Sequence, residues 1–296
     1  MDRQYKPSDR VYGLWLAGAM ALTSPSLVNA QPVEGAKEPV CQPAPPTLQS
    51  THELLELFLK PGETFDFSKL SPDARKETVA SMVEAEKRKA HDWPDLCHYA
   101  DENTKLLASG QKPRVVFMGD SITEIWKEGQ PELFSAGNAD RGISGQTTPQ
   151  MLLRMYSDVI NLHPRIVHIM AGTNDISGNT GPVSDQTIVD NLRAMIVLAK
   201  AYKIKVLLGS ITPSSGFAMR PGANPAARIA SVNGMLRKLA VEQDVTFIDY
   251  YTPLVDGVGG MRAGLSNDGL HPNRNGYAIM SPLAEQAIAQ AEKRHM

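Results

Sequence analysis

The sequence has few cysteines, no excess of charge of either sign and no long apolar run, and each absence excludes a class of protein. Its 296 residues include 2 cysteines, too few for a small disulfide scaffold. The 30 basic residues are balanced by 32 acidic ones and form no stripe along the chain, so a nucleic-acid partner is not expected. A content of 42% apolar and 21% charged residues is typical of a globular protein with a real core.

The cysteines and histidines form no metal-binding pattern. Cys41 and Cys97 lack a Cys-x-x-Cys spacing and the 7 histidines are scattered, so neither a metal nor another cofactor is predicted. An oxidising compartment would allow the two cysteines to pair, and the sequence alone does not decide whether they do.

The first thirty residues have the layout of an export signal. Basic residues precede an uncharged stretch from Val11 to Leu22, and the small residues before Gln31 offer a cleavage point. The apolar run, about a dozen residues, is shorter than the ~20 of a membrane-spanning helix. We therefore predict a signal peptide over residues 1–30, cleaved near Ala30, and a secreted or periplasmic protein without a stable membrane anchor. An uncleaved anchor or a buried N-terminal helix is the alternative.

Two further segments precede the main domain. Residues 31–50 are rich in proline and small residues, which predicts a linker. Residues 51–110 contain amphipathic stretches around His52–Lys60 and Pro72–Ala90, and Ser71 is placed to cap the second. We predict that they form a helical lead-in packed on the domain that follows, residues 111–296.

From residue 111 onward, short β-branched apolar runs alternate with longer helical periods, which predicts an α/β fold with a parallel sheet. Its class is a three-layer α/β/α sandwich with a flavodoxin-like sheet, whose ligands bind at the carboxyl ends of the strands. The expected strands are Arg114–Met118, Ala139–Arg141, Arg165–Met170, Lys205–Ser210 and Thr246–Asp249. The expected helices are Thr148–Leu162, Ile188–Tyr202, Ala226–Glu242 and Gly276–Lys293.

The loop after the first expected strand contains Gly119-Asp120-Ser121. A serine there stands at a helix N-terminus, where backbone N–H groups and the helix dipole favour a developing oxyanion. Gly-Asp-Ser alone is weak evidence, because a serine before a helix is often only an N-cap.

The last loop contains Asp268 and His271, three residues apart. Across a turn, the carboxylate can accept the imidazole Nδ1–H and leave Nε2 free to take a serine proton. A loop histidine capped by a neighbouring aspartate is the structural alternative. The two loops together favour a Ser121–His271–Asp268 triad.

Two more loops offer donors for an oxyanion. Gly145 lies in the run Arg141–Gln146, where the absence of a side chain would let a backbone N–H approach a reacting carbonyl, and Asn174 could donate from its amide. Ordinary turn chemistry explains either loop taken alone. Asp120 and Asp175 are expected to cap and brace loops, and Arg141 to form a structural ion pair in preference to a substrate contact.

These blocks, in this order, resemble the SGNH/GDSL hydrolases over residues 113–292. The matching residues are Gly119-Asp120-Ser121, Gly145, Gly172-Thr173-Asn174-Asp175 and Asp268-Gly269-Leu270-His271-Pro272. The resemblance implies the α/β/α fold, a Ser121–His271–Asp268 triad, and an oxyanion hole formed by the Ser121 N–H, the Gly145 N–H and the Asn174 amide. Ile122-Thr123 replaces the leucine that gives the GDSL group its name, which leaves the chemistry unchanged.

Within that family, the chain looks most like bacterial esterases of the platelet-activating-factor acetylhydrolase and carbohydrate acetylesterase branch. This implies a serine esterase that hydrolyses short-chain, chiefly acetyl, esters of small molecules or glycans. No long apolar lid is evident, and the segment 212–221 is the expected specificity loop. A thioesterase or lysophospholipase with the same triad is one alternative. A carbohydrate-binding module without catalysis is another, disfavoured by the complete set of site residues.

Overall fold

The computed structural model describes residues 41, 49–217, 222 and 224–293. The predicted signal peptide and most of the predicted linker lie outside these residues. Gln49 and Ser50, which were predicted to belong to the linker, instead begin the first helix, α1 (Gln49–Leu59). Among the described helices, none combines the length and apolar character needed to cross a membrane.

The centre of the fold is a parallel sheet of five strands in the order β2-β1-β3-β4-β5. This is the flavodoxin-like order, so the predicted fold class is confirmed. The strands are β1 (Val115–Gly119), β2 (Asn138–Gly142), β3 (Ile166–Met170), β4 (Lys205–Gly209) and β5 (Thr246–Ile248). Every residue of β1 and β3 is buried, as expected for central strands covered on both faces.

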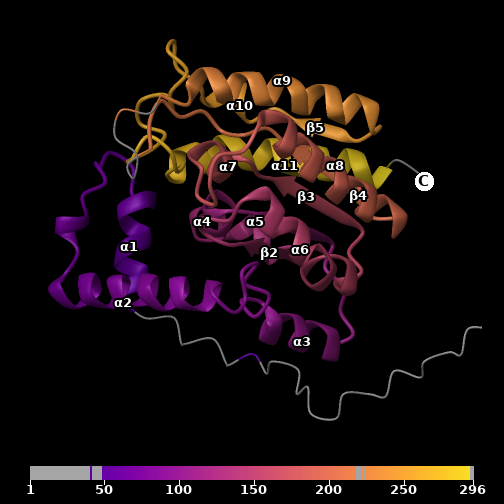
Figure 1. Cartoon of the computed structure of the whole chain (residues 1–296), viewed down its shortest axis with the longest axis horizontal. Coiled ribbons are helices and arrows are strands. Elements are labelled where there is room, and N and C mark those ends of the chain that lie inside the picture. Colours follow the sequence, from indigo (N-terminus) through magenta and orange to yellow (C-terminus); the bar gives the residue numbers. More distant parts are fainter. Residues whose placement is uncertain (1–40, 42–48, 218–221, 223, 294–296) are drawn as a thin grey trace, which may run out of the picture. The chain divides into compact units, whose positions relative to one another are not determined.

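Alternate residues of each strand face opposite helical layers, because successive side chains of a strand point to opposite sides. Val116 and Met118 pack in the core layer that contains α6, α8 and α9, whereas Val115 and Phe117 pack with α4 and α11. Figure 1 labels these helices. These helices are α4 (Ser121–Gly129), α6 (Thr148–Asp158), α8 (Asp185–Ala201), α9 (Ala226–Glu242) and α11 (Arg274–Lys293).

The local signals placed most helices within a few residues. Ser71 accepts a hydrogen bond from the Ala74 N–H and Pro72 opens α2 (Pro72–Lys89), as predicted. The helix expected over Thr148–Leu162 is shorter: α6 ends at Asp158, and a 3₁₀ turn, η2 (Ile160–Leu162), follows it.

Short helices were not predicted, since four or five residues carry too little periodicity. They are α5 (Pro131–Ser135), α7 (Thr173–Ser177) and α10 (Tyr251–Leu254). The 3₁₀ turn η1 (Phe67–Lys69) and the longer helix α3 (Ala100–Ala108) were not predicted either.

The lead-in is joined to the rest of the fold by apolar and polar contacts, and a disulfide ties it to Cys41 in the predicted linker. Leu59 of α1 is buried in the core layer of α4 and α11. Asn103 of α3 donates to Asp158 at the end of α6. Cys41 forms a disulfide with Cys97, just before α3, so the pairing that the sequence left open is made.

Candidate active site

The loops after the strands bring the predicted residues to one edge of the sheet. Ser121 follows β1 as the first residue of α4, and the Asp120 carboxylate caps this helix by accepting the Ile122 N–H at 3.0 Å. Helix α4 passes so close to the end of β2 that there is no room for a side chain on Gly142: a Cβ there would lie 2.2 Å from the Glu124 backbone nitrogen. Glycine at this position lets α4 lie directly against the end of β2.

Ser121, His271 and Asp268 form an unbroken hydrogen-bonded series. The Ser121 Oγ lies 2.9 Å from His271 Nε2, and His271 Nδ1 lies 2.6 Å from Asp268 Oδ2. The histidine and aspartate side chains are 13% and 10% exposed. A partly exposed hydroxyl in contact with a nearly buried imidazole is a geometry suited to transfer of the serine proton to Nε2.

The Asp268 carboxylate is held ionised. Burial alone would raise its pKa, but the hydrogen bond and charge of His271 and the backbone N–H groups of Leu270 and His271 outweigh burial and lower it to about 2. The other carboxylate oxygen, Oδ1, accepts those two N–H groups at 2.9 and 2.8 Å and the Ser266 hydroxyl at 3.0 Å. Near neutral pH this aspartate therefore presents a fixed negative charge to Nδ1.

The loop after β2 makes a tight turn at Gly145. This glycine has φ +80°, in the left-handed region that side chains rarely adopt, and the next residue closes the turn by donating from the Gln146 N–H to the Ile143 carbonyl. The Ser121 and Gly145 N–H groups have no acceptor within the described part of the chain. Both are therefore available to an oxyanion.

Asn174 of α7 is oriented by two partners. Its Nδ2 donates to the Gln146 carbonyl at 3.0 Å, and its Oδ1 accepts from Asn179 Nδ2 at 2.9 Å. Asn179 also donates to the Gly145 carbonyl at 3.1 Å. Asn179 therefore fixes which end of the Asn174 amide carries the donors and ties it to the Gly145 turn; sequence reasoning missed it, because asparagine is ordinary in loops.

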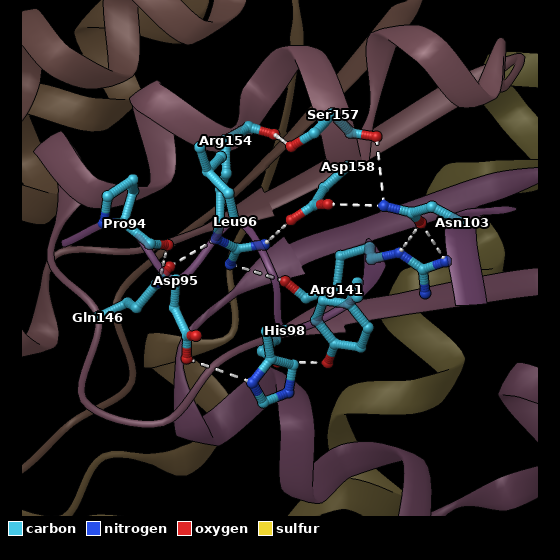
Figure 2. A network of polar contacts seen from close by, with 12 residues as sticks. Pro94, Asp95, Leu96, His98, Asn103, Arg141, Gln146, Arg154, Ser157 and Asp158 are labelled. Atoms are coloured by element: carbon cyan, nitrogen blue, oxygen red, sulfur yellow. Dashed lines mark hydrogen bonds and ion pairs between the residues drawn. The ribbon is translucent and has the colours of Figure 1, made fainter. Parts of the chain in front are cut away.

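The buried side chain of Arg154 forms hydrogen bonds with the ends of β1 and β2 and with the loop that follows β2. Arg154 of α6 is fully buried and donates to the Gly119 carbonyl at 2.9 Å and to the Arg141 carbonyl at 2.8 Å. Gly119 is the last residue of β1, and Arg141 is the last but one of β2. It also donates to the Gln146 side chain and pairs with Asp158 at 3.0 Å (Figure 2). One guanidinium therefore links the end of β1 to the Gly145 loop.

The remaining predicted side chains have structural contacts. Asp175 braces the start of α6 by accepting the Thr148 N–H and hydroxyl at 2.9 and 2.6 Å. Arg141 is 3% exposed, lies over the Tyr99 ring, bonds Asn103 and forms an ion pair with Glu102 at 3.4 Å. The expected capping, bracing and ion-pair roles of Asp120, Asp175 and Arg141 are confirmed. Within the expected specificity loop 212–221, residues 218–221 lie outside the described residues.

The lead-in also reaches the histidine loop, which sequence reasoning did not foresee. The Phe58 ring of α1 lies edge-on to the His271 ring, with 4.8 Å between centroids. Asn267, in the same loop, donates to the Leu57 and Lys60 carbonyls at 2.8 and 2.9 Å. The wall beside the histidine therefore comes from a segment more than two hundred residues away in sequence.

Comparisons with known proteins agree with the fold and with the family that the chain was predicted to resemble. The model of the GDSL-like lipase/acylhydrolase family matches residues 117–279. A GDSL-like lipase structure from Bacteroides thetaiotaomicron is 41% identical, with a TM-score of 0.64 over 67% of this chain and 98% of that one. A second structure, from Bacteroides fragilis, gives the same TM-score at 42% identity over the same shares of both chains.

A more distant relative was found among curated proteins. The uncharacterized lipoprotein YqeF of Bacillus subtilis is 28% identical in an alignment 147 residues long that covers 42% of this chain. The match spans 60% of the length of that relative.

Proposed function

The chain belongs to the GDSL-like lipase/acylhydrolase family, and on this premise we propose that it is a serine esterase with Ser121 as nucleophile, His271 as general base and acid, and Asp268 as the carboxylate that orients the histidine. The observation that carries the proposal is the hydrogen-bonded series from the Ser121 hydroxyl through His271 to Asp268 at the carboxyl edge of the sheet.

The first half of the reaction acylates Ser121. His271 Nε2 takes the hydroxyl proton as Ser121 Oγ bonds to the ester carbonyl carbon, and the carbonyl oxygen becomes an oxyanion. The tetrahedral intermediate collapses, the bond to the alcohol oxygen breaks, and His271 returns the proton to that oxygen. Asp268 stays ionised throughout and stabilises the imidazolium.

The second half releases the acid. Water gives a proton to His271 as it attacks the acyl carbon, and the proton then passes to Ser121 Oγ as the acyl bond breaks. In both halves the Ser121 and Gly145 N–H groups and the Asn174 amide are the proposed donors to the oxyanion. Such donors stabilise charge that develops only in the transition state, so they act on kcat.

We assign short acyl groups, acetyl above all, to this site. A longer acyl chain contributes about 0.8 kcal/mol for each methylene that it buries, which requires an apolar wall. The groups around the Gly145 turn are polar: Ser144 donates its N–H to the Glu124 carboxylate at 2.7 Å, and the exposed Asn179 lies against Gly145. Acetylated glycans and other small acetate esters are the substrates that such a rim accommodates.

Export through residues 1–30 belongs to the same proposal. Its support is the signal-like layout of the N-terminus and the Cys41–Cys97 disulfide, a bond that persists in oxidising compartments. If the signal is cleaved after Ala30, N-terminal sequencing of the exported protein begins at Gln31; a mature chain that retains Met1 contradicts cleavage.

The proposed function is tested by the hydrolysis of p-nitrophenyl acetate, butyrate and octanoate by the full chain and by Ser121→Ala. Ser135→Ala is the matched control, because this exposed residue donates its hydroxyl to the Glu132 carbonyl within α5. The expected result is turnover that falls with chain length, is lost in Ser121→Ala and is kept in Ser135→Ala. Equal turnover by Ser121→Ala contradicts the triad, and faster turnover of octanoate contradicts the short-chain assignment.

A further inference from the structure

The helical lead-in supplies an aromatic pair beside the histidine. Phe58 of α1 and Phe65, six residues beyond the end of α1, are stacked with ring centroids 4.5 Å apart, and the Phe58 ring lies 4.8 Å from the ring of His271. Both phenylalanines are half-buried, so neither is wholly withdrawn from solvent. The pair lies outside residues 117–279, which the family model matches.

The lead-in is fixed to the histidine loop at several points. The Asn267 side chain bonds two carbonyls at the end of α1, and the Phe65 N–H donates to the Asn267 carbonyl at 2.9 Å. Arg274, at the start of α11, forms a bidentate ion pair with Glu56. These contacts fix the backbone around Phe58 and Phe65 relative to the histidine loop.

The proposed mechanism decides which part of a substrate meets this pair. His271 Nε2 gives its proton to the leaving alcohol, so the alcohol oxygen lies within hydrogen-bond reach of that nitrogen. Two of the three proposed oxyanion donors, the Gly145 N–H and the Asn174 amide, come from the segments after β2 and β3, whereas the imidazole comes from the loop before α11. Groups that flank the imidazole therefore contact the carbons next to the alcohol oxygen and leave the acyl group untouched.

We propose that Phe58 and Phe65 form the leaving-group subsite and select esters whose alcohol is a ring with a flat apolar face, such as the C–H face of a sugar. Partly exposed aromatic rings beside a few polar groups are a common lining for such ligands. This inference rests on the proposed esterase function, and it assigns the alcohol preference to the lead-in.

The test compares acetate esters that differ only in the alcohol. The full chain, Phe58→Ala and Phe58→Tyr are assayed with ethyl acetate and cyclohexyl acetate, and the ratio of the two kcat/KM values is taken for each protein. Because intrinsic ester reactivity cancels between proteins, a change in this ratio reports the subsite. Phe58→Ala is expected to lower the preference for the cyclohexyl ester about 10-fold, as for a lost apolar contact, and Phe58→Tyr to keep it.

Two controls separate a subsite from a structural role. The ratio of kcat/KM for ethyl acetate to kcat/KM for ethyl butyrate should not change in Phe58→Ala, because the substitution does not affect contacts to the acyl group. The acetyl-enzyme formed from p-nitrophenyl acetate should also be hydrolysed at an unchanged rate. Phe67→Ala, in the same lead-in, serves as the matched aromatic control. If Phe58→Ala does not fold, Phe65→Ala and Phe58→Leu replace it, judged by far-UV circular dichroism.

The outcomes divide cleanly. An unchanged ratio overturns the subsite. If kcat/KM also falls equally for both esters, the Phe58 ring only positions the imidazole. Turnover that does not depend on Ser121 defeats the proposed function itself, whereas Ser121-dependent turnover with an unchanged alcohol ratio defeats this inference alone.

Discussion

Replacing Arg154 by methionine removes the one cation of a buried pair. Its guanidinium is fully buried and donates to two backbone carbonyls, to Gln146 and to Asp158, which is itself 1% exposed. Methionine fills similar space but leaves an uncompensated carboxylate and removes one donor from each of two carbonyls, although the Gly119 carbonyl still accepts the Ile143 N–H. Losing one partner of a buried pair costs about 3–5 kcal/mol. At about 2–4 °C per kcal/mol for a domain of this size, the melting temperature should fall by about 10 °C.

The assay is urea unfolding followed by far-UV circular dichroism, with two comparison variants. Arg193→Met breaks an ion pair with Glu242 whose side chains are 36% and 54% exposed, so its cost should be under about 1 kcal/mol. Arg154→Met combined with Asp158→Leu removes the stranded charge and should be more stable than Arg154→Met alone. If Arg154→Met is no less stable than Arg193→Met, the reasoning from buried charge is wrong.

Three further predictions concern the site, the acid range and the disulfide. Asn174→Ala should lower kcat about 10²–10³-fold with an unchanged circular dichroism spectrum, since one oxyanion donor is lost; an unchanged kcat would remove Asn174 from the hole. The Asp268 pKa is lowered from 3.8 to about 2, so its contribution to stability is complete above pH 4 and is lost as pH falls towards 2. The unfolding free energy of Asp268→Asn, measured in urea from pH 5 to 2, should therefore fall less steeply with acid than that of the parent; parallel slopes would refute this. Cys97→Ser opens a loop with a sequence separation of 56 and should cost about 4 kcal/mol by the loop-entropy relation, a value that a melting temperature equal to that of the parent would exclude.

The strands and the main site residues could be predicted because their signals are local. Four apolar runs and a weaker segment at Ala139–Arg141 predicted the five strands, each within one residue at either end. Gly145 was singled out only together with the other site blocks, because ordinary turn chemistry explains its loop taken alone. Ser121 and His271 were predicted to meet because both follow the carboxyl ends of parallel strands, an edge that the topology makes common to them. The triad and the oxyanion hole themselves stay predictions until the variants are assayed.

The supporting residues could not be predicted, because their partners are distant in sequence. Arg154 carried a faint signal: with Asp158 it is a charged i, i+4 pair on the helix that also carries the buried Met151 and Met155. Phe58 carried none, since nothing local distinguishes a helix phenylalanine that packs in a core from one that flanks a histidine. Only the fold brings α1 to the loop at the other end of the chain.

The contacts between α1 and the histidine loop affect the order in which the site folds. The contacts between the Leu57 carbonyl and Asn267, and between Glu56 and Arg274, close separations of 210 and 218 residues. Contacts of such separation cost much loop entropy and form late. During synthesis, the apolar residues of α1 are made long before the loop that they contact, so the histidine side of the site is completed only after that loop has been added.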